Sequence, residues 1–174
     1  MEFKKDKLQT ERLLLKPFAE CNRQQMVQIL MDKEIKKTYM IPDFDHEKQA
    51  EVLFDKMMKA SQDISRFIYG IHFQDVLIGF VNDCEVLETE IEIGYVIASA
   101  HQRKGFATEA VRACIDELFR MGFTRVKAGF FQENVASCRV MQKSGMHKID
   151  FEEDIEYKGV THHCIYYAID KVSS

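Results

Sequence analysis

Helical and alternating hydrophobic patterns divide most of the chain into regular elements. Over residues 105–121 the apolar side chains recur at i, i+3, i+4 and i+7, which predicts an amphipathic helix. Gly122 follows this helix as the kind of residue that ends one. Similar spacing predicts a helix over 22–32, a second that begins after a cap at Asp45, and a short one over 135–143.

A strict alternation at residues 90–97 predicts a strand whose two faces differ in polarity. One face carries Ile91, Ile93, Tyr95 and Ile97, and the other carries Glu90, Glu92, Gly94 and Val96. Further strands are predicted at 13–18, 66–73, 76–81, 126–131, 148–157 and 160–170. We expect one α/β domain over 1–174, with a mixed sheet of about seven strands and about four flanking helices.

Composition narrows the classes of protein that this pattern can represent. The net charge of −4 makes a nucleic-acid partner unexpected, and no apolar run approaches the roughly 20 residues of a membrane helix. The five widely spaced cysteines include no Cys-x-x-Cys pair, which favours reduced thiols in a cytoplasmic protein. We predict no metal site, because the neighbouring His162 and His163 would point to opposite faces of a strand.

The junction between the strand at 90–97 and the helix at 105–121 is the most informative segment. A short polar loop leads to Gly105, where the backbone amides of a helix N-terminus lack partners within the helix. Arg103 and Lys104 add positive charge, and the small Ala107 leaves room around the first turn. This pattern suits a pyrophosphate, although an ordinary basic helix start would look the same.

Three blocks of this sequence resemble the GNAT superfamily of acetyl-CoA-dependent N-acetyltransferases. Residues 102–107, Gln-Arg-Lys-Gly-Phe-Ala, match its Gln/Arg-x-x-Gly-x-Gly/Ala signature. Residues 134–146 are similar to its Asn-x-x-Ala/Ser…Lys-x-Gly segment, and residues 10–18 resemble the opening strand of the branch with the ribosomal-protein-alanine acetyltransferases. The resemblance covers about residues 8–170. It implies a mostly antiparallel GNAT sheet with a splayed cofactor cleft and acetyl-CoA as co-substrate.

The resemblance also implies which residues hold the cofactor. The strand end would splay from its neighbour through a bulge, and its backbone would pair with the pantetheine arm at Tyr95, Val96 and Ile97. The pyrophosphate would be held by the amides of Gln102, Arg103, Lys104, Gly105, Phe106, Ala107 and Thr108. Asn134 and Ser137 would contact pantetheine or the thioester end.

Acetyl transfer to an amine requires a base, because an alkyl ammonium has a pKa of about 10 and cannot attack while protonated. Glu92 is the candidate, in a setting that resembles the proposed base of this branch, and Glu90 on the same face stays an alternative. A backbone N–H near Ile97 would stabilise the charge on the thioester oxygen. Many family members carry a tyrosine as the leaving-group acid where this chain has Met141, so Ser137 is the candidate for that role.

We expect the acceptor to be a primary amine, and the sequence leaves open whether it is a peptide N-terminus or a small molecule. Acidic residues gather at Glu85, Glu88, Glu90 and Glu92 and again at Glu152, Glu153, Asp154 and Glu156. In one cleft they would attract a cationic amine, and otherwise they are a solvated face. Met57 and Met58, with Phe44, would line the acceptor side. A non-catalytic acyl-CoA-binding module is the alternative function, and a homodimer is left open.

Overall fold

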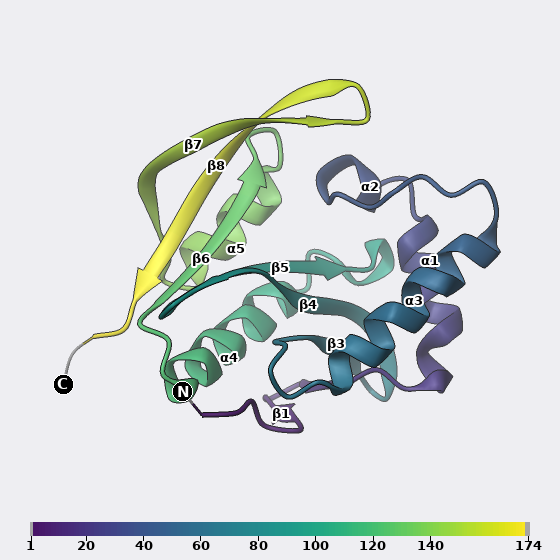
Figure 1. The fold of residues 1–174 in the computed structure, drawn as a ribbon, viewed down its shortest axis with the longest axis horizontal. Coiled ribbons are helices and arrows are strands. Elements are labelled where there is room, and N and C mark those ends of the chain that lie inside the picture. Colours follow the sequence, from purple (N-terminus) through teal and green to yellow (C-terminus); the bar gives the residue numbers. More distant parts are fainter. Residues whose placement is uncertain (1, 173–174) are drawn as a thin grey trace.

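The computed structural model describes residues 2–172, which form one eight-stranded sheet with helices on both faces (Figure 1). The strands are β1 (Leu8–Gln9), β2 (Leu13–Lys16), β3 (Tyr69–Phe73), β4 (Val76–Leu87), β5 (Glu90–Ile97), β6 (Arg125–Phe131), β7 (His147–Tyr157) and β8 (Val160–Asp170). The α-helices are α1 (Arg23–Met31), α2 (Ile35–Thr38), α3 (Glu47–Gln62), α4 (Phe106–Met121) and α5 (Val135–Lys143).

The strands lie in the order β1-β2-β3-β4-β5-β6-β8-β7. Neighbours are antiparallel except for β5 and β6, which run parallel because α4 connects them. The mixed, mostly antiparallel α/β architecture is therefore the expected one. Two elements were not predicted: β1 has only two residues, and α2 is a single turn, so neither is long enough to show a periodic pattern.

The predicted alternation along β5 is confirmed by two apolar clusters that lie on opposite faces of the sheet. Ile91, Ile93 and Ile97 belong to a cluster with α4, and Tyr95 packs against it. Val96 belongs to the other cluster, with α1 and α3. One face of β5 therefore packs toward α4, and the other packs toward α1 and α3. Because side chains alternate along a strand, Glu90, Glu92 and Gly94 lie with Val96 on the α1–α3 side.

Glycines at both ends delimit α4, as the sequence indicates. Gly105 is its N-cap with φ +81° and Gly122 its C-cap with φ +106°, a left-handed conformation that favours glycine. The prediction that Asp45 caps α3 is wrong. The N-cap is His46. The Asp45 backbone amide instead donates a hydrogen bond to Oε1 of Gln49, 2.8 Å away, so a side chain from the first turn of α3 accepts from the backbone that precedes the helix.

No helix within residues 2–172 has both the length and the apolar character needed to cross a bilayer.

Candidate active site

The sheet opens between β5 and β6. The two strands are in register over three residue pairs, ending at Glu92 opposite Lys127. Beyond that point β5 stays paired with β4, whereas β6 follows β8, so the two strands separate (Figure 1). The splay has the expected position, but the irregular residue lies elsewhere: the register shift is in β4, where Cys84 is the additional residue.

The edge of β5 that faces this opening presents backbone amides. The Ala98 amide donates to the Ile78 carbonyl of β4 at 2.7 Å. Since amides alternate in direction along a strand, those of Tyr95 and Ile97 point away from β4 and into the opening. An extended chain placed there would find hydrogen-bond donors spaced as in a sheet.

The loop from β5 to α4 turns its amides toward one side. Arg103 and Gly105 both have left-handed backbone, with φ +62° and +81°. Such alternation of conformations gathers successive N–H groups into an anion-binding concavity, and Gly105 has no side chain to cap the first turn of α4. The loop is held by the Gln102 side chain, which donates to the Ile97 carbonyl at 2.9 Å, and by Arg12, which donates to the Lys104 carbonyl at 2.9 Å.

The N-terminus of α5 lies across the opening from β5. Asn134 caps this helix by accepting a hydrogen bond from the Ser137 amide at 3.2 Å. The Tyr95 hydroxyl reaches from β5 to Ser137, 2.9 Å from its Oγ and 3.2 Å from its carbonyl oxygen. Burial raises the pKa of Tyr95 to about 12, so this phenol stays protonated at neutral pH. Met141, at the position where a tyrosine is common, is buried in the core.

On the opposite face of β5, Glu92 lies where the strands part. Its carboxylate is 3.4 Å from Nζ of Lys127, which also lies 3.4 Å from Glu85 and 3.5 Å from Glu90. We call these three glutamates and Lys127 the carboxylate cluster. Burial raises the pKa of Glu92 above its usual value, and Lys127 limits the rise.

The second predicted acidic group joins the carboxylate cluster only in part. Glu153 accepts a hydrogen bond from the Tyr166 hydroxyl at 2.5 Å, and its charge contributes to raising the pKa of Glu92. Glu152 and Asp154 instead hold His163, at 2.9 Å and 2.8 Å. Consecutive residues of β7 alternate between faces, so one run of acids divides into two environments.

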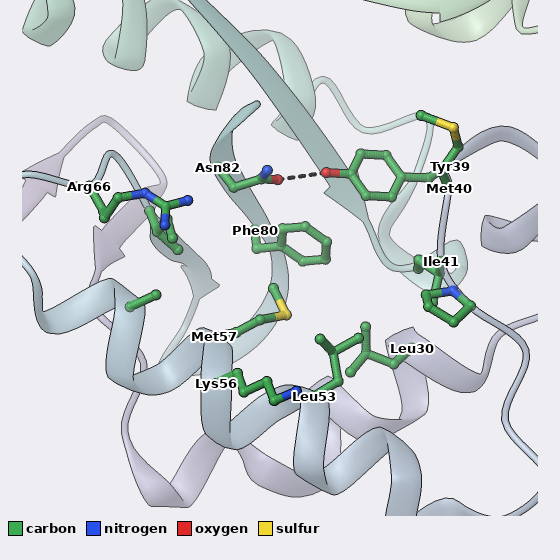
Figure 2. A pocket seen from close by; sticks show the side chains of 13 residues that line it. Leu30, Tyr39, Met40, Ile41, Leu53, Lys56, Met57, Arg66, Phe80 and Asn82 are labelled. Carbon is green, nitrogen blue, oxygen red and sulfur yellow. Dashed lines mark hydrogen bonds between the residues drawn. The ribbon is translucent and has the colours of Figure 1, made fainter. Parts of the chain in front are cut away.

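Sequence reasoning did not identify Tyr39 and Asn82. The Tyr39 hydroxyl donates to Oδ1 of Asn82 at 2.6 Å (Figure 2). It also lies against Gly94, where an added Cβ would be 2.7 Å from the hydroxyl oxygen. A glycine within a strand often marks the close approach of another group, and Gly94 was the available signal.

The structure thus separates the candidate residues into three places along β5. Tyr95, Asn134 and Ser137 come together on the α5 side of the opening. The residues from Gln102 to Thr108 lie past the carboxyl end of β5, at the start of α4. Glu92 lies on the other face, where the opening begins. An extended, phosphate-bearing molecule in the opening would therefore have helix amides at one end and a carboxylate near the other.

A helix N-terminus without a side-chain cap suits a phosphate, and a strand edge that opens from its neighbour suits an extended chain. The family model described as acetyltransferase (GNAT) domain matches residues 12–147, and the chain belongs to this family of N-acetyltransferases. It is 30% identical to the uncharacterized N-acetyltransferase YnaD of Bacillus subtilis over 152 residues, 86% of this chain and 88% of YnaD.

Two further comparisons report a partial sequence match and a shared fold. It is 38% identical to the probable N-acetyltransferase YjcK of B. subtilis over 78 residues, which span 42% of this chain but only 43% of YjcK. The structure of RimL, a ribosomal L7/L12 alpha-N-protein acetyltransferase in complex with coenzyme A, superposes with a TM-score of 0.79 at 17% identity and covers 92% of this chain and 95% of RimL. The chain shares its fold with RimL, whose structure holds coenzyme A.

Proposed function

We propose that this protein transfers an acetyl group from acetyl-CoA directly to a primary amine while both are bound. The observation that carries the proposal is the opening of β5 from β6 between the amides of the α4 N-terminus and Glu92. The donors match the two parts of the cofactor that need them, the pyrophosphate and the amide-containing pantetheine arm.

The cofactor would lie along β5. The amides of Tyr95 and Ile97 would pair with pantetheine as one more strand does, with Val96 between them. The amides from Gln102 to Thr108 would hold the pyrophosphate, where the dipole of α4 and the nearby Arg103 and Lys104 favour negative charge. Asn134, on the other side, would contact pantetheine.

Glu92 is the proposed base. Its raised pKa suits a group that takes a proton from an ammonium near neutral pH, and the cost of charging it is limited by Lys127. Glu90 shares the face but lies at the closed end of the strand pair, between Lys127 and Arg125, so it is further from the opening.

The remaining charge changes involve the thioester. As the amine nitrogen bonds to the carbonyl carbon, negative charge on the thioester oxygen would be stabilised by a β5 amide near Ile97. The carbon–sulfur bond then breaks and the thiolate leaves. If the Tyr95 hydroxyl donates to Oγ of Ser137, the hydroxyl hydrogen of Ser137 is free to point to the sulfur. Tyr95 and Ser137 would then take the role of the tyrosine that many family members carry at the position of Met141.

The acceptor would be a peptide N-terminus or a small-molecule amine. RimL acts on a protein N-terminus by its description, and the carboxylate cluster would attract either kind of ammonium. The exposed Cys21 and Cys84 are free thiols, which supports a reducing compartment and the cytoplasm as the site of action.

A thiol-release assay with acetyl-CoA and a panel of amines and N-terminal peptides tests the proposal, with products identified by mass spectrometry. Release of CoA together with an acetylated amine supports it. If acetyl-CoA raises the melting temperature while no amine in the panel releases CoA, the protein is instead an acyl-CoA-binding module, the reading that the buried Met141 favours.

A further inference from the structure

A cavity of about 370 Å³ lies between α1, α3 and β4, on the same face of the sheet as Glu92 (Figure 2). Its volume is within the range of small-molecule sites. The apolar walls come from Leu30, Ile41, Leu53, Met57, Ile68 and Phe80. Of the three residues expected on the acceptor side, Met57 lines this cavity, whereas Phe44 and Met58 pack against the neighbouring apolar cluster.

The polar end of this cavity adjoins the proposed reaction centre. Tyr39 and Asn82 line it and bond to each other there. The Tyr39 hydroxyl rests against Gly94, which is two residues from Glu92 on the same face of β5. Two residues of a strand span about 7 Å. A group in the cavity is thus separated from Glu92 by the Tyr39 side chain and by Sγ of Cys84, which both lie over Gly94.

The charges around the cavity favour an ammonium only at the end that Tyr39 and Asn82 line. Arg66 at its rim is bidentate with Asp83, at 2.7 Å and 2.9 Å, so its positive charge is neutralised. Lys56 lies across the cavity from Asn82 (Figure 2). On the Glu92 side of Tyr39, the carboxylate cluster holds three glutamates against Lys127. Arg125 is a further cation there, 3.9 Å from Glu90. An amine would therefore orient with its nitrogen toward Glu92 and its apolar part in the cavity.

We propose that this cavity selects acceptors whose primary amine carries an aliphatic or aromatic group close to the nitrogen, with Tyr39 and Asn82 as the residues that position the amine. This inference rests on the proposed function and specifies its substrate class. A peptide that begins with Leu, Met or Phe and a small arylalkylamine share this chemistry.

The first test compares acceptors that differ only in the apolar group. Peptides with N-terminal Leu or Phe are compared with otherwise identical peptides that begin with Gly or Ser, and phenethylamine with ethylamine. We expect kcat/KM to be at least about tenfold higher for the apolar member of the pairs, since a few methylenes in an apolar pocket give such ratios. The peptide and amine arms distinguish the two sources of the group. Equal kcat/KM values within the pairs of both arms would overturn the inference.

The second test uses two adjacent methionines of α3, both half-buried against the same cluster, of which only Met57 lines the cavity. Met57→Trp fills the cavity, so the Leu-to-Gly ratio of kcat/KM should fall about tenfold or more while acetyl-CoA affinity is kept. Met58→Trp is the control for an added indole on this helix and should keep the wild-type ratio. An unchanged ratio in Met57→Trp, or an equal loss in both variants, contradicts the inference.

Different results would contradict the acetyltransferase function and the role of the cavity. Acetylation of Gly and Leu peptides at the same rate leaves the acetyltransferase proposal intact and removes only the cavity's role. Acetyl-CoA binding with no acetylated product from any amine contradicts the proposed function and the inference that rests on it. A melting temperature and an acetyl-CoA dissociation constant for each variant show that it is folded.

Discussion

Lys127 Nζ lies 3.4 Å from the Glu92 carboxylate, and these two residues form the last registered pair of β5 and β6 before the strands separate. Lys127 is 9% exposed, so its charge acts in a poorly solvated place. Burial alone would lower the pKa of Lys127, but Glu92 and Glu90 outweigh that effect and raise it. The fork of the sheet therefore holds a positive charge that keeps the half-buried Glu92 carboxylate ionisable.

This pair predicts the acid limb of the pH profile. Because Glu92 must be ionised to accept a proton and burial raises its pKa, kcat/KM should rise with pH through an apparent pKa above the ordinary glutamate value. Lys127→Met removes the charge that limits the rise, so the limb should move to higher pH. Rates measured over roughly pH 5 to 9 would show the shift. Lys148→Met, at an exposed ion pair with Glu152, should leave the limb in place, and a common shift in both variants would contradict the assignment.

The identity of the base is tested by two glutamates on one face of β5. Glu92→Gln should lower kcat by about 10² to 10⁴ with little change in acetyl-CoA affinity, as loss of a general base does. Glu90→Gln is the matched control and should keep most of the activity, because Glu90 lies in the closed part of the strand pair. Steady-state rates and calorimetry separate turnover from affinity. A loss of turnover confined to Glu90→Gln would assign the base to Glu90.

The cofactor loop is tested at a glycine with left-handed backbone. Gly105→Val should raise the dissociation constant of acetyl-CoA at least tenfold, about 1.4 kcal/mol, because the side chain strains the turn and stands where phosphate must approach. Gly159→Val imposes similar strain at φ +75° in the β7–β8 turn, where nothing lies within 4 Å of an added Cβ. That control should bind acetyl-CoA normally. Wild-type affinity in Gly105→Val would remove the loop from the cofactor site.

The contact between Tyr95 and Ser137 predicts non-additive effects on turnover. Ser137→Ala and Tyr95→Phe each remove one hydroxyl of a pair 2.9 Å apart, so each should slow turnover. The double variant should be slowed by less than the product of the two effects, since the groups act through one hydrogen bond. Steady-state rates with a good acceptor give the comparison. Independent, multiplicative effects would mean that the pair does not act as a unit on the leaving group.

Stability should depend on pH through His72. Burial lowers the pKa of this histidine, whose Nε2 lies 3.2 Å from Nδ2 of Asn22. The folded state keeps it neutral while the unfolded chain takes up a proton near pH 6.5, so stability is complete above that pH and falls as the pH drops below it. Melting temperatures across this range should show the decline, and His72→Gln should weaken it. An unchanged slope in the variant would assign the pH dependence to other groups.

Much of the architecture follows from local patterns in the sequence. Period-two alternation defined the two faces of β5. The bounds of α5 and β8 agree with the sequence prediction because α5 ends at a turn at residues 144–145 and β8 begins after a turn at residues 158–159. The Gly105 motif located the helix start that carries the candidate cofactor site. These features depend on backbone conformation and on burial of one face, which short stretches of sequence specify by themselves.

The acceptor side was decided by tertiary structure. Tyr39 meets Asn82 across 43 residues, and Lys127 meets Glu92 across 35, with no periodicity that links either pair. The packing of strands and helices in three dimensions decides which acids of a run converge. It also decides which of two adjacent methionines lines a cavity and which hydroxyl contacts Ser137. Local sequence sets the direction of a side chain relative to its own element, and only packing of distant elements sets what it meets.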